Sequence, residues 1–265
     1  MHTTGDGTVN AVQRRDSIVD LVDERGRVSV AELTDLFGVT DASIRRDLMI
    51  LEDGGRLRRV HGGAVGRAAK LANTVYATKT RARREEKVRI GAAAARLLQP
   101  GEVVLFDSGT TVAQVAAQMP PPLRAPNAIT AVTHSLPVIE EIGSWESPHL
   151  IALGGLYLPD YRAFVGPHTI ASVKELTADV IFLGCDGLTV ESGLTTPHVL
   201  VAEVGAAATG RARRVVALAD ASKIGRQGFT PIVPLSDVDL LITDSGADPV
   251  RVAEIRAAGV EVLLA

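Results

Sequence analysis

One stretch of the sequence decides the fold around it: Thr40-Asp-Ala-Ser-Ile-Arg-Arg-Asp-Leu-Met-Ile-Leu-Glu52. Its apolar residues recur at about 100° per residue and share one helix face, made of Ile44, Leu48 and Leu51. The opposite face and its flanks carry small and basic residues: Ala42, Ser43, Arg45 and Arg46. Thr40 is a suitable N-cap before the apolar period begins. The stretch therefore predicts a helix with a buried back and a basic front.

A basic helix front has two interpretations. An isolated Arg-Arg pair is more often a solvated surface than a binding site. In a DNA-binding helix, however, the side chains nearest the N-terminus enter the major groove first. Arginine suits that position, because its planar guanidinium can bind guanine O6 and N7 or hold a phosphate. The flanking sequence decides between the two.

Two short helices are predicted before the basic one. Ser29-Val-Ala-Glu32 is a capping box. The helix that it opens carries apolar residues on one face and ends at Gly38; these residues are Leu33, Leu36 and Phe37. An earlier helix ends at Gly26 and is marked by Ile18, Leu21 and Val22. Three short helices, with a tight glycine turn before the basic one, form the helix-turn-helix pattern.

A small hairpin, or wing, is predicted after the basic helix. Gly54-Gly55 ends the helix, and Arg56-Leu-Arg-Arg-Val-His-Gly-Gly-Ala-Val65 alternates towards a Gly-Gly turn. The hairpin would carry Arg56 among its basic residues. Combining helix and wing, we expect these DNA contacts: Thr40, Ala42, Ser43, Arg45, Arg46, Arg58, Arg59 and His61.

Residues 28–65 closely resemble the winged helix-turn-helix of the DeoR family of bacterial transcriptional regulators. The resemblance is carried by Ser43-Ile-Arg-Arg-Asp-Leu48, by Leu51-Glu52 and by Arg59-Val-His-Gly-Gly-Ala64. It implies sequence-specific binding to double-stranded operator DNA, and we expect a repressor of carbohydrate metabolism genes. It also implies that the rest of the chain is a phosphorylated-sugar sensor similar in fold to ribose-5-phosphate isomerase.

Composition limits the classes of protein to consider. The 265 residues allow one small domain and one of ordinary α/β size. Cys185 is the single cysteine, so an internal disulfide is excluded. No apolar run reaches the roughly 18 residues of a membrane span, and residues 1–10 lack a signal-peptide pattern. We therefore expect a cytoplasmic protein with no membrane partner. We also expect no metal and no cofactor.

The charge is distributed unevenly along the chain. The net charge of −3 argues against nucleic-acid binding. Residues 45–84, however, hold 11 Lys/Arg against 3 Asp/Glu, whereas residues 85–265 hold 13 against 20. A local basic surface is enough to attract phosphates. Residues 79–84 alternatively form a merely solvated basic segment.

The pattern divides the chain into two domains and a linker. We expect a winged helix-turn-helix over residues 10–66, a partly helical linker over 67–84 and an α/β effector-sensing domain over 85–265. A helix over residues 88–98 opens that domain. Just before it, Arg81 and Glu86-Lys87 approximate an Arg-x-x-x-Glu-Lys signature of the resembling family.

A candidate anion site follows the first predicted strand. Val103-Val-Leu-Phe106 is a buried strand, and Asp107-Ser-Gly-Thr-Thr111 leads into a helix. Free N–H groups, hydroxyls and the positive helix end converge in such a loop. The alternative is that Ser108, Thr110 and Thr111 only cap the helix. Ligands bind at the carboxyl ends of strands in such sheets, and the loop resembles the family's Asp-x-Gly-Thr-Thr.

Strands and helices then alternate to the end of the chain, which predicts an α/β domain with a mostly parallel sheet and helices on both faces. Polar residues follow the strands and would meet at one edge: Thr133-His134-Ser135, Gly154-Gly155, Cys185-Asp186-Gly187, Asp220-Ala-Ser-Lys223 and Thr243-Asp244. Some have structural alternatives. Asp244, for example, is placed to cap a helix near Pro249.

The resemblance assigns ligand contacts to several of these residues. Lys223 lies in a shared Asp-Ala-Ser-Lys-Ile-Gly signature, and Glu203 stands where the family has a pocket carboxylate. His134 replaces the usual asparagine, and we expect a neutral imidazole rather than one that titrates near neutral pH. The expected ligand is a phosphorylated sugar or related small anionic metabolite. Its expected contacts are Asp107, Ser108, Gly109, Thr110, Thr111, His134, Asp186, Gly187, Glu203 and Lys223.

An isomerase with an appended DNA-binding domain is the main alternative. Aldose–ketose isomerisation needs a carboxylate base and further acids. Here Asp186 has no second acid until Glu191, and Val204 replaces the lysine that follows the isomerase's base. We therefore expect no enzyme activity. A third possibility, a nucleoid-associated protein, would use the wing but would leave the phosphate loop without a function.

We expect a homo-oligomer, because helix-turn-helix proteins usually bind paired half-sites on DNA.

Overall fold

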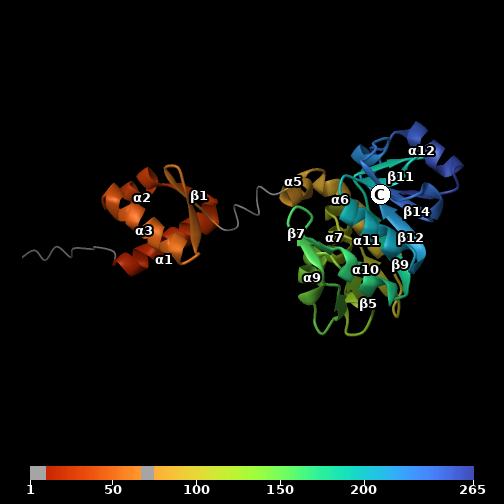
Figure 1. The fold of residues 1–265 in the computed structure, drawn as a ribbon, viewed down its shortest axis with the longest axis horizontal. Helices are drawn as coiled ribbons and strands as arrows, with labels where there is room; N and C mark the ends of the chain where they lie inside the picture. Colours follow the sequence, from red (N-terminus) through yellow and green to blue (C-terminus); the bar gives the residue numbers. More distant parts are fainter. Residues whose placement is uncertain (1–9, 67–74) are drawn as a thin grey trace, which may run out of the picture. The chain divides into compact units, whose positions relative to one another are not determined.

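The computed structural model describes residues 10–66 and 75–265. They form two compact units, one up to Thr78 and one from Lys79 onward (Figure 1). Part of the expected linker, residues 67–74, lies outside the described residues. The remainder begins with helix α5 (Val75–Arg81). No helix in the described ranges is long and apolar enough to cross a membrane.

The N-terminal unit is a winged helix-turn-helix, as predicted. Its described helices are α1 (Ala11–Arg25), α2 (Val30–Phe37) and α3 (Asp41–Asp53). Its antiparallel sheet has the order β1-β3-β2, with β1 (Arg27–Ser29), β2 (Leu57–Val60) and β3 (Gly63–Gly66). The predicted wing is the β2-β3 hairpin. Strand β1 was not predicted, because three residues are too few to show a period of two.

Local chemistry fixes the helix ends. The Ser29 backbone N–H donates to the Glu32 carboxylate at 2.7 Å, and Glu32 N–H donates back to the Ser29 hydroxyl at 3.1 Å. This predicted capping box lowers the pKa of Glu32. Gly26 and Gly38 end their helices at φ +74° and +62°, a region that glycine enters without strain. The Thr40 hydroxyl caps α3 by accepting from Ser43 N–H at 3.3 Å.

The back of α3 is buried, as its period predicts. Ile44, Leu48 and Leu51 are at most 2% exposed. They share a core with residues of α1, α2 and the sheet, namely Ile18, Val19, Val22, Val28, Val30, Leu33, Leu57 and Ala64. Because the back of α3 supplies its contacts with this core, the residues on the front of the helix are not needed for packing.

One acidic residue of α3 is buried, which was not predicted from the sequence. Asp47 lies beside the apolar face and is 4% exposed. Its carboxylate accepts from Arg14 Nε at 2.7 Å and lies 3.5 Å from Arg15 Nε. The hydrophobic period does not reveal this ion pair, since its partners are 32 and 33 positions away. It ties α3 to α1.

The C-terminal unit is built on a parallel sheet. Within the described residues, seven strands pair in the order β15-β14-β12-β9-β4-β5-β6, and every ladder is parallel. The strands are β4 (Val103–Phe106), β5 (Thr130–Thr133), β6 (His149–Ala152), β9 (Ala178–Gly184), β12 (Ala212–Leu218), β14 (Leu240–Thr243) and β15 (Glu261–Leu264). The predicted α/β sheet is thereby confirmed.

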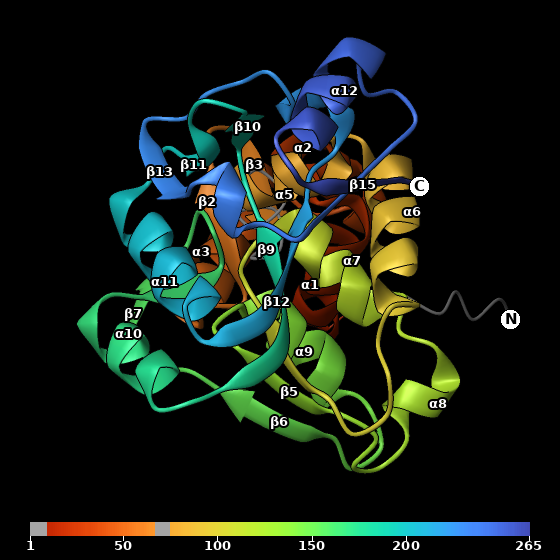
Figure 2. The ribbon, with the colours of Figure 1, turned by 90° about the vertical axis from the view of Figure 1, so that its right-hand side faces the viewer.

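Helices cover both faces of this sheet (Figure 2). One face packs on α6 (Arg84–Ala95), α7 (Thr110–Ala117) and α9 (Leu136–Gly143). The other packs on α10 (Pro167–Lys174), α11 (Val199–Thr209) and α12 (Pro249–Ala257). Val180 and Phe182 of β9 join the first face, whereas Ile181 and Leu183 join the second. The strands are therefore apolar on both sides, which is typical of parallel sheets.

Two smaller strand groups were not predicted. An antiparallel sheet has the order β10-β11-β13, with β10 (Gly187–Thr189), β11 (Gly193–Thr196) and β13 (Thr230–Val233). A hairpin joins β7 (Leu156–Leu158) to β8 (Ala163–Val165). Their strands are three or four residues long and rich in glycine, threonine or aromatic residues, so they show no clear alternation. Short helical segments complete the unit: α8 (Pro121–Arg124), η1 (Ala221–Lys223) and η2 (Leu235–Asp237).

Replacing Asp47 by alanine should loosen α1 and α3. The change removes the carboxylate that joins them, and a hydrogen bond to a charged group contributes about 2 kcal/mol. We expect the free energy of opening of both helices to fall by about that amount, measured by amide hydrogen exchange on the intact chain. Asp53→Ala, at the exposed end of the same helix, is the control. Equal effects of the two changes would contradict the assigned role of Asp47.

Candidate functional site

The front of α3 is accessible, as a DNA-reading helix requires. Arg45 and Arg46 are exposed, and so are Thr40 and Ala42, while Ser43 is half-buried. Arg45 makes only a loose pair with Asp41, at 3.8 Å between side chains that are both 62% exposed. Such an exposed pair costs little to break, so the Arg45 guanidinium remains available to another anion.

The wing is fastened to α3 by one acid. Glu52 accepts from the Arg59 backbone N–H at 2.9 Å and from the Arg59 Nε at 2.7 Å. These bonds lower the pKa of Glu52. Arg59 is one of the DNA contacts predicted from the sequence, whereas no role was predicted for Glu52. The structure shows that Arg59 positions the wing, and the side chains of Arg58, Arg59 and His61 are all exposed.

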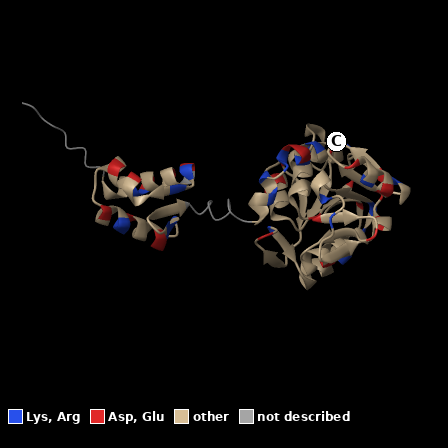
Figure 3. Cartoon of the chain, turned by 90° about the horizontal axis from the view of Figure 1, so that it is seen from above, with Lys and Arg blue, Asp and Glu red and all other residues tan. Residues whose placement is uncertain are grey.

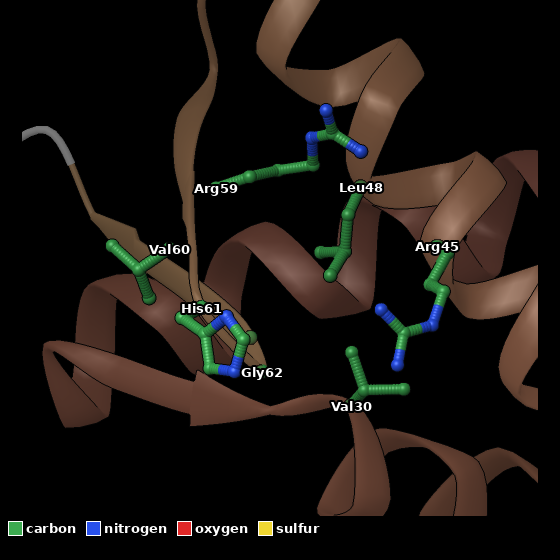
Figure 4. A pocket seen from close by; sticks show the side chains of 8 residues that line it. Val30, Arg45, Leu48, Arg59, Val60, His61 and Gly62 are labelled. Carbon is green, nitrogen blue, oxygen red and sulfur yellow. The ribbon is translucent and has the colours of Figure 1, made fainter.

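A hollow lies between α3 and the wing (Figure 4). Its volume is about 440 Å³. Arg45 from the helix and His61 from the wing turn border the same space in Figure 4, with Val30 and Leu48 nearby. The helix and the wing therefore present basic groups around a common opening.

The basic character of this unit is local. Residues 10–66 hold 9 Lys/Arg and 10 Asp/Glu, and the two kinds are intermixed on the ribbon (Figure 3). Much of the excess counted over residues 45–84 comes from residues 67–84. Within the described unit, the attraction for phosphate therefore rests on the arginines of α3 and the wing, rather than on the charge of the whole unit.

The second candidate site lies at the carboxyl edge of the parallel sheet. Asp107, Asp186, Asp220 and Asp244 follow four of its strands, β4, β9, β12 and β14. Asp107 Oδ2 accepts from Gly184 N–H at 3.2 Å. Asp244 accepts from Ala221 N–H at 2.7 Å, so it ties two strand-end loops together; the cap of α12 is Asp248. Hydrogen bonds thus join the loops along one edge.

Asp107 and His134 form a buried bridge. His134 Nε2 lies 2.9 Å from Asp107 Oδ1, and Nδ1 lies 2.7 Å from the Phe164 carbonyl oxygen. The imidazole has no exposed surface. A carbonyl can only accept, so Nδ1 carries a hydrogen, and the other nitrogen shares a proton with the carboxylate. The pair joins the segments that follow β4 and β5 to strand β8.

The loop after β4 leaves a helix N-terminus without a side-chain cap. Gly109 is the N-cap residue of α7, at φ +129°, and no side-chain cap hydrogen bond is formed there among the described residues. Among the described residues, no hydrogen bond joins the hydroxyl of Ser108, Thr110 or Thr111 to a backbone N–H at the start of α7. Ser108 and Thr111 are buried, and Thr110 is half-buried. Backbone N–H groups at the start of α7 remain available to an anion.

Asp186 is the centre of a second cluster. Its Oδ1 lies 2.6 Å from Lys79 Nζ and 3.7 Å from Lys223 Nζ, and its Oδ2 accepts from Thr196 at 3.0 Å. Gly187, buried beside it, begins β10. Burial, followed by the Asp186 carboxylate, raises the pKa of the Cys185 thiol to about 12. Cys185 is therefore a neutral thiol near pH 7.

The expected ligand residues do not all form one hydrogen-bonded group. The structure joins Asp107 to His134, and it joins Asp186 to Lys223. Glu203 lies exposed on α11, and within the described residues no hydrogen bond or ion pair connects it to the other predicted contacts.

Three cations near the start of this unit were missed as a group. Lys79, Arg83 and Lys87 are spaced four residues apart. Buried Lys87 donates to the carbonyls of Lys79 and, at 2.7 Å, of Ala82. Arg83 lies 3.8 Å from the Asp220 carboxylate. Burial lowers the pKa of Lys87, and the Asp220 carboxylate opposes that shift. The four-residue spacing places the three cations on one helical face, which the sequence could have indicated. The sequence could not show that Lys79 and Arg83 pair with the strand-end acids Asp186 and Asp220.

An exposed winged helix-turn-helix front, followed by a parallel α/β unit with a polar edge, defines a two-domain DNA-binding regulator. Residues 14–68 match the DeoR-like helix-turn-helix domain, and residues 82–245 match the DeoR C-terminal sensor domain. The chain belongs to the DeoR family of transcriptional regulators.

Two curated relatives support this assignment along nearly the whole chain. The HTH-type transcriptional regulator GlpR of Haloferax volcanii is 37% identical over 95% of this chain and 96% of its own. A putative aga operon transcriptional repressor of Escherichia coli O157:H7 is 30% identical over 95% and 93%. Ribose 5-phosphate isomerase A from Methanocaldococcus jannaschii, a solved structure, is 18% identical over 53% of this chain and 54% of its own, with a TM-score of 0.39. A likeness at that level carries no argument about activity.

Replacing His134 by alanine should destabilise the C-terminal unit. The change removes both hydrogen bonds of the imidazole and leaves the Asp107 carboxylate buried beside a cavity, so we expect a loss of about 3 kcal/mol. The single tryptophan, Trp145, lies in this unit, and its fluorescence during urea unfolding of the intact chain provides the measurement. His149→Ala, at an exposed ring that contacts Thr130, is the control. A fall no larger than that of the control would refute the bridge.

Proposed function

We propose that this regulator is a cytoplasmic repressor of carbohydrate metabolism genes, controlled by a phosphorylated sugar. A homo-oligomer presents paired α3 helices and wings to operator DNA. The ligand binds at the carboxyl edge of the parallel sheet and weakens DNA binding by favouring an arrangement of subunits that fits the operator less well. It needs only a higher affinity for that arrangement.

The DNA-binding half of the proposal is carried by the contrast between the two faces of α3. Its back is locked into the core by Leu48 and its neighbours, whereas Arg45 and Arg46 are exposed in front. Such a helix presents its side chains without conformational rearrangement. The proposed DNA contacts are Thr40, Ala42, Ser43, Arg45, Arg46, Arg58, Arg59 and His61. Repression itself is inferred from the family and from relatives that are named as repressors.

The ligand-binding half is carried by the arrangement of anion-binding groups. The uncapped start of α7 at Gly109 supplies backbone N–H groups, and Lys223 supplies an ammonium group that is 22% exposed. Both follow strands of the same parallel sheet. This combination favours a small molecule that carries a phosphate. The proposed contacts with this ligand remain those expected from the sequence.

Replacing Arg46 by alanine should weaken operator binding. The loss of one arginine contact to a base costs about 1–3 kcal/mol, or roughly 5- to 160-fold in affinity. Fluorescence anisotropy on DNA fragments selected by the wild-type protein, at fixed salt, gives the affinity. Arg96→Ala, an exposed arginine of the C-terminal unit, is the matched control. If the two variants bind equally well, Arg46 is not part of the DNA-reading surface.

A thermal-shift screen of the intact chain tests the proposed ligand. The panel contains sugar phosphates and their unphosphorylated parents. A ligand that binds only the native state stabilises it, by about 2.7 kcal/mol at 100 times its Kd. We expect one or a few phosphates to raise the unfolding temperature, and Lys223→Gln to reduce that rise. No shift with any phosphate would count against a phosphorylated sugar.

A further inference from the structure

Asp41 is an acidic residue at the end of α3 that a DNA-reading helix presents first. It is the first residue of the helix, directly after the Thr40 cap, and its side chain is 62% exposed. The other acids of α3 are placed differently: Asp47 is buried, while Glu52 and Asp53 lie in the last turn. Since the N-terminal side chains of such a helix enter the major groove first, Asp41 lies where a base edge is met.

The Asp41 carboxylate has one fixed oxygen and one accessible oxygen. Its Oδ1 accepts from the Thr34 hydroxyl of α2 at 3.2 Å. Its Oδ2 lies 3.8 Å from Nη2 of Arg45, which is four residues further along the helix and equally exposed. Thr34 therefore holds the carboxylate from the side of α2, and the second oxygen is able to accept from another donor.

Helix stability is the simpler reason for an acid at this position. A carboxylate in the first turn is stabilised by the positive end of the helix dipole, and an i,i+4 pair with arginine adds to that effect. Neither effect concerns DNA. The phosphates of DNA, however, repel a carboxylate, so Asp41 lowers the affinity for every sequence that offers it no hydrogen-bond donor.

The four bases differ in what they offer a carboxylate. An ionised carboxylate only accepts hydrogen bonds. In the major groove guanine presents acceptors, thymine an acceptor and a methyl group, and adenine a donor beside an acceptor. Cytosine presents its N4 amino group with no acceptor beside it. Cytosine is therefore the base that best fits a carboxylate.

We propose that Asp41 is a specificity-determining residue: its Oδ2 accepts from the N4 amino group of one cytosine in each operator half-site, and its charge disfavours DNA that lacks this base. The inference rests on the proposed use of α3 as the DNA-reading helix. On binding, Arg45 exchanges Asp41 for a guanine or a phosphate of the DNA, so that both charges keep a partner. Specificity then arises from repulsion as well as from attraction.

Fluorescence anisotropy of the intact chain tests the proposal. The probes are operator fragments selected by the wild type, with each base pair replaced in turn, and a duplex of unrelated sequence at the same salt concentration. For Asp41→Ala, the preference for cytosine at one position of each half-site should fall from about tenfold to less than about threefold, because one base contact is lost. Affinity for the unrelated duplex should rise about fivefold, because a charge that repels phosphates is removed. Asp20→Ala, which removes an exposed acid from α1, is the matched control and should leave both quantities unchanged.

A second variant separates base reading from helix stability. Asp41→Asn removes the charge and keeps the shape. Because asparagine pairs with N6 and N7 of adenine, the preferred base at the same position should change from cytosine to adenine. If Asp41 serves only the helix, Asp41→Ala will instead weaken binding to the operator and to the unrelated duplex alike, with unchanged base preferences. Relaxation at a position where the wild type prefers another base would also overturn the assignment.

The outcomes separate this inference from the function on which it rests. If Arg46→Ala loses operator affinity while Asp41→Ala keeps the base preferences of the wild type, α3 reads DNA and Asp41 has no part in it. If the wild type selects no sequence from a random pool of duplexes, both proposals fail.

Discussion

The parallel pairing of the seven described strands is the constraint on which the C-terminal unit depends. A parallel ladder directs every carboxyl end to the same edge, so residues far apart in sequence become neighbours. Asp107 and Gly184 are 77 positions apart, yet a hydrogen bond joins them across adjacent strands. The apolar faces of β4 and β9 supply the burial that keeps this order. The polar edge is thus a consequence of a hydrophobic pattern within the strands.

Two acidic residues stabilise the DNA-binding unit. Asp47 and Glu52 lie on the same helix as the exposed arginines, and from their charge alone they would be expected to weaken DNA binding. In the structure both are paired within the protein: Asp47 is buried against Arg14, and Glu52 holds the wing through Arg59. Since each acid is paired within the protein, the front of α3 keeps its basic character despite a nearly balanced composition.

The sequence predicted those features that depend on local periods and caps. The three helix ends at Gly26, Gly38 and Thr40 and the apolar back of α3 follow from short-range chemistry, and the parallel sheet follows from the alternation of strands and helices. The small β10-β11-β13 sheet was missed because its strands are short and its pairing is long-range. The ion pairs of Asp47 and Asp186 were missed for a related reason: their partners come from distant segments, which no local pattern identifies.

The contrast between local patterns and long-range contacts also explains which site residues the family resemblance could identify. A family motif marks Lys223 and the loop after β4, because these lie in recognisable short runs. It does not mark Lys79, which follows residues without a clear period and reaches Asp186 only after the chain has folded. A carboxylate shared by two lysines from distant segments is a property of the tertiary structure. Such a group stabilises one arrangement of the chain, because it joins segments that lie far apart in the sequence.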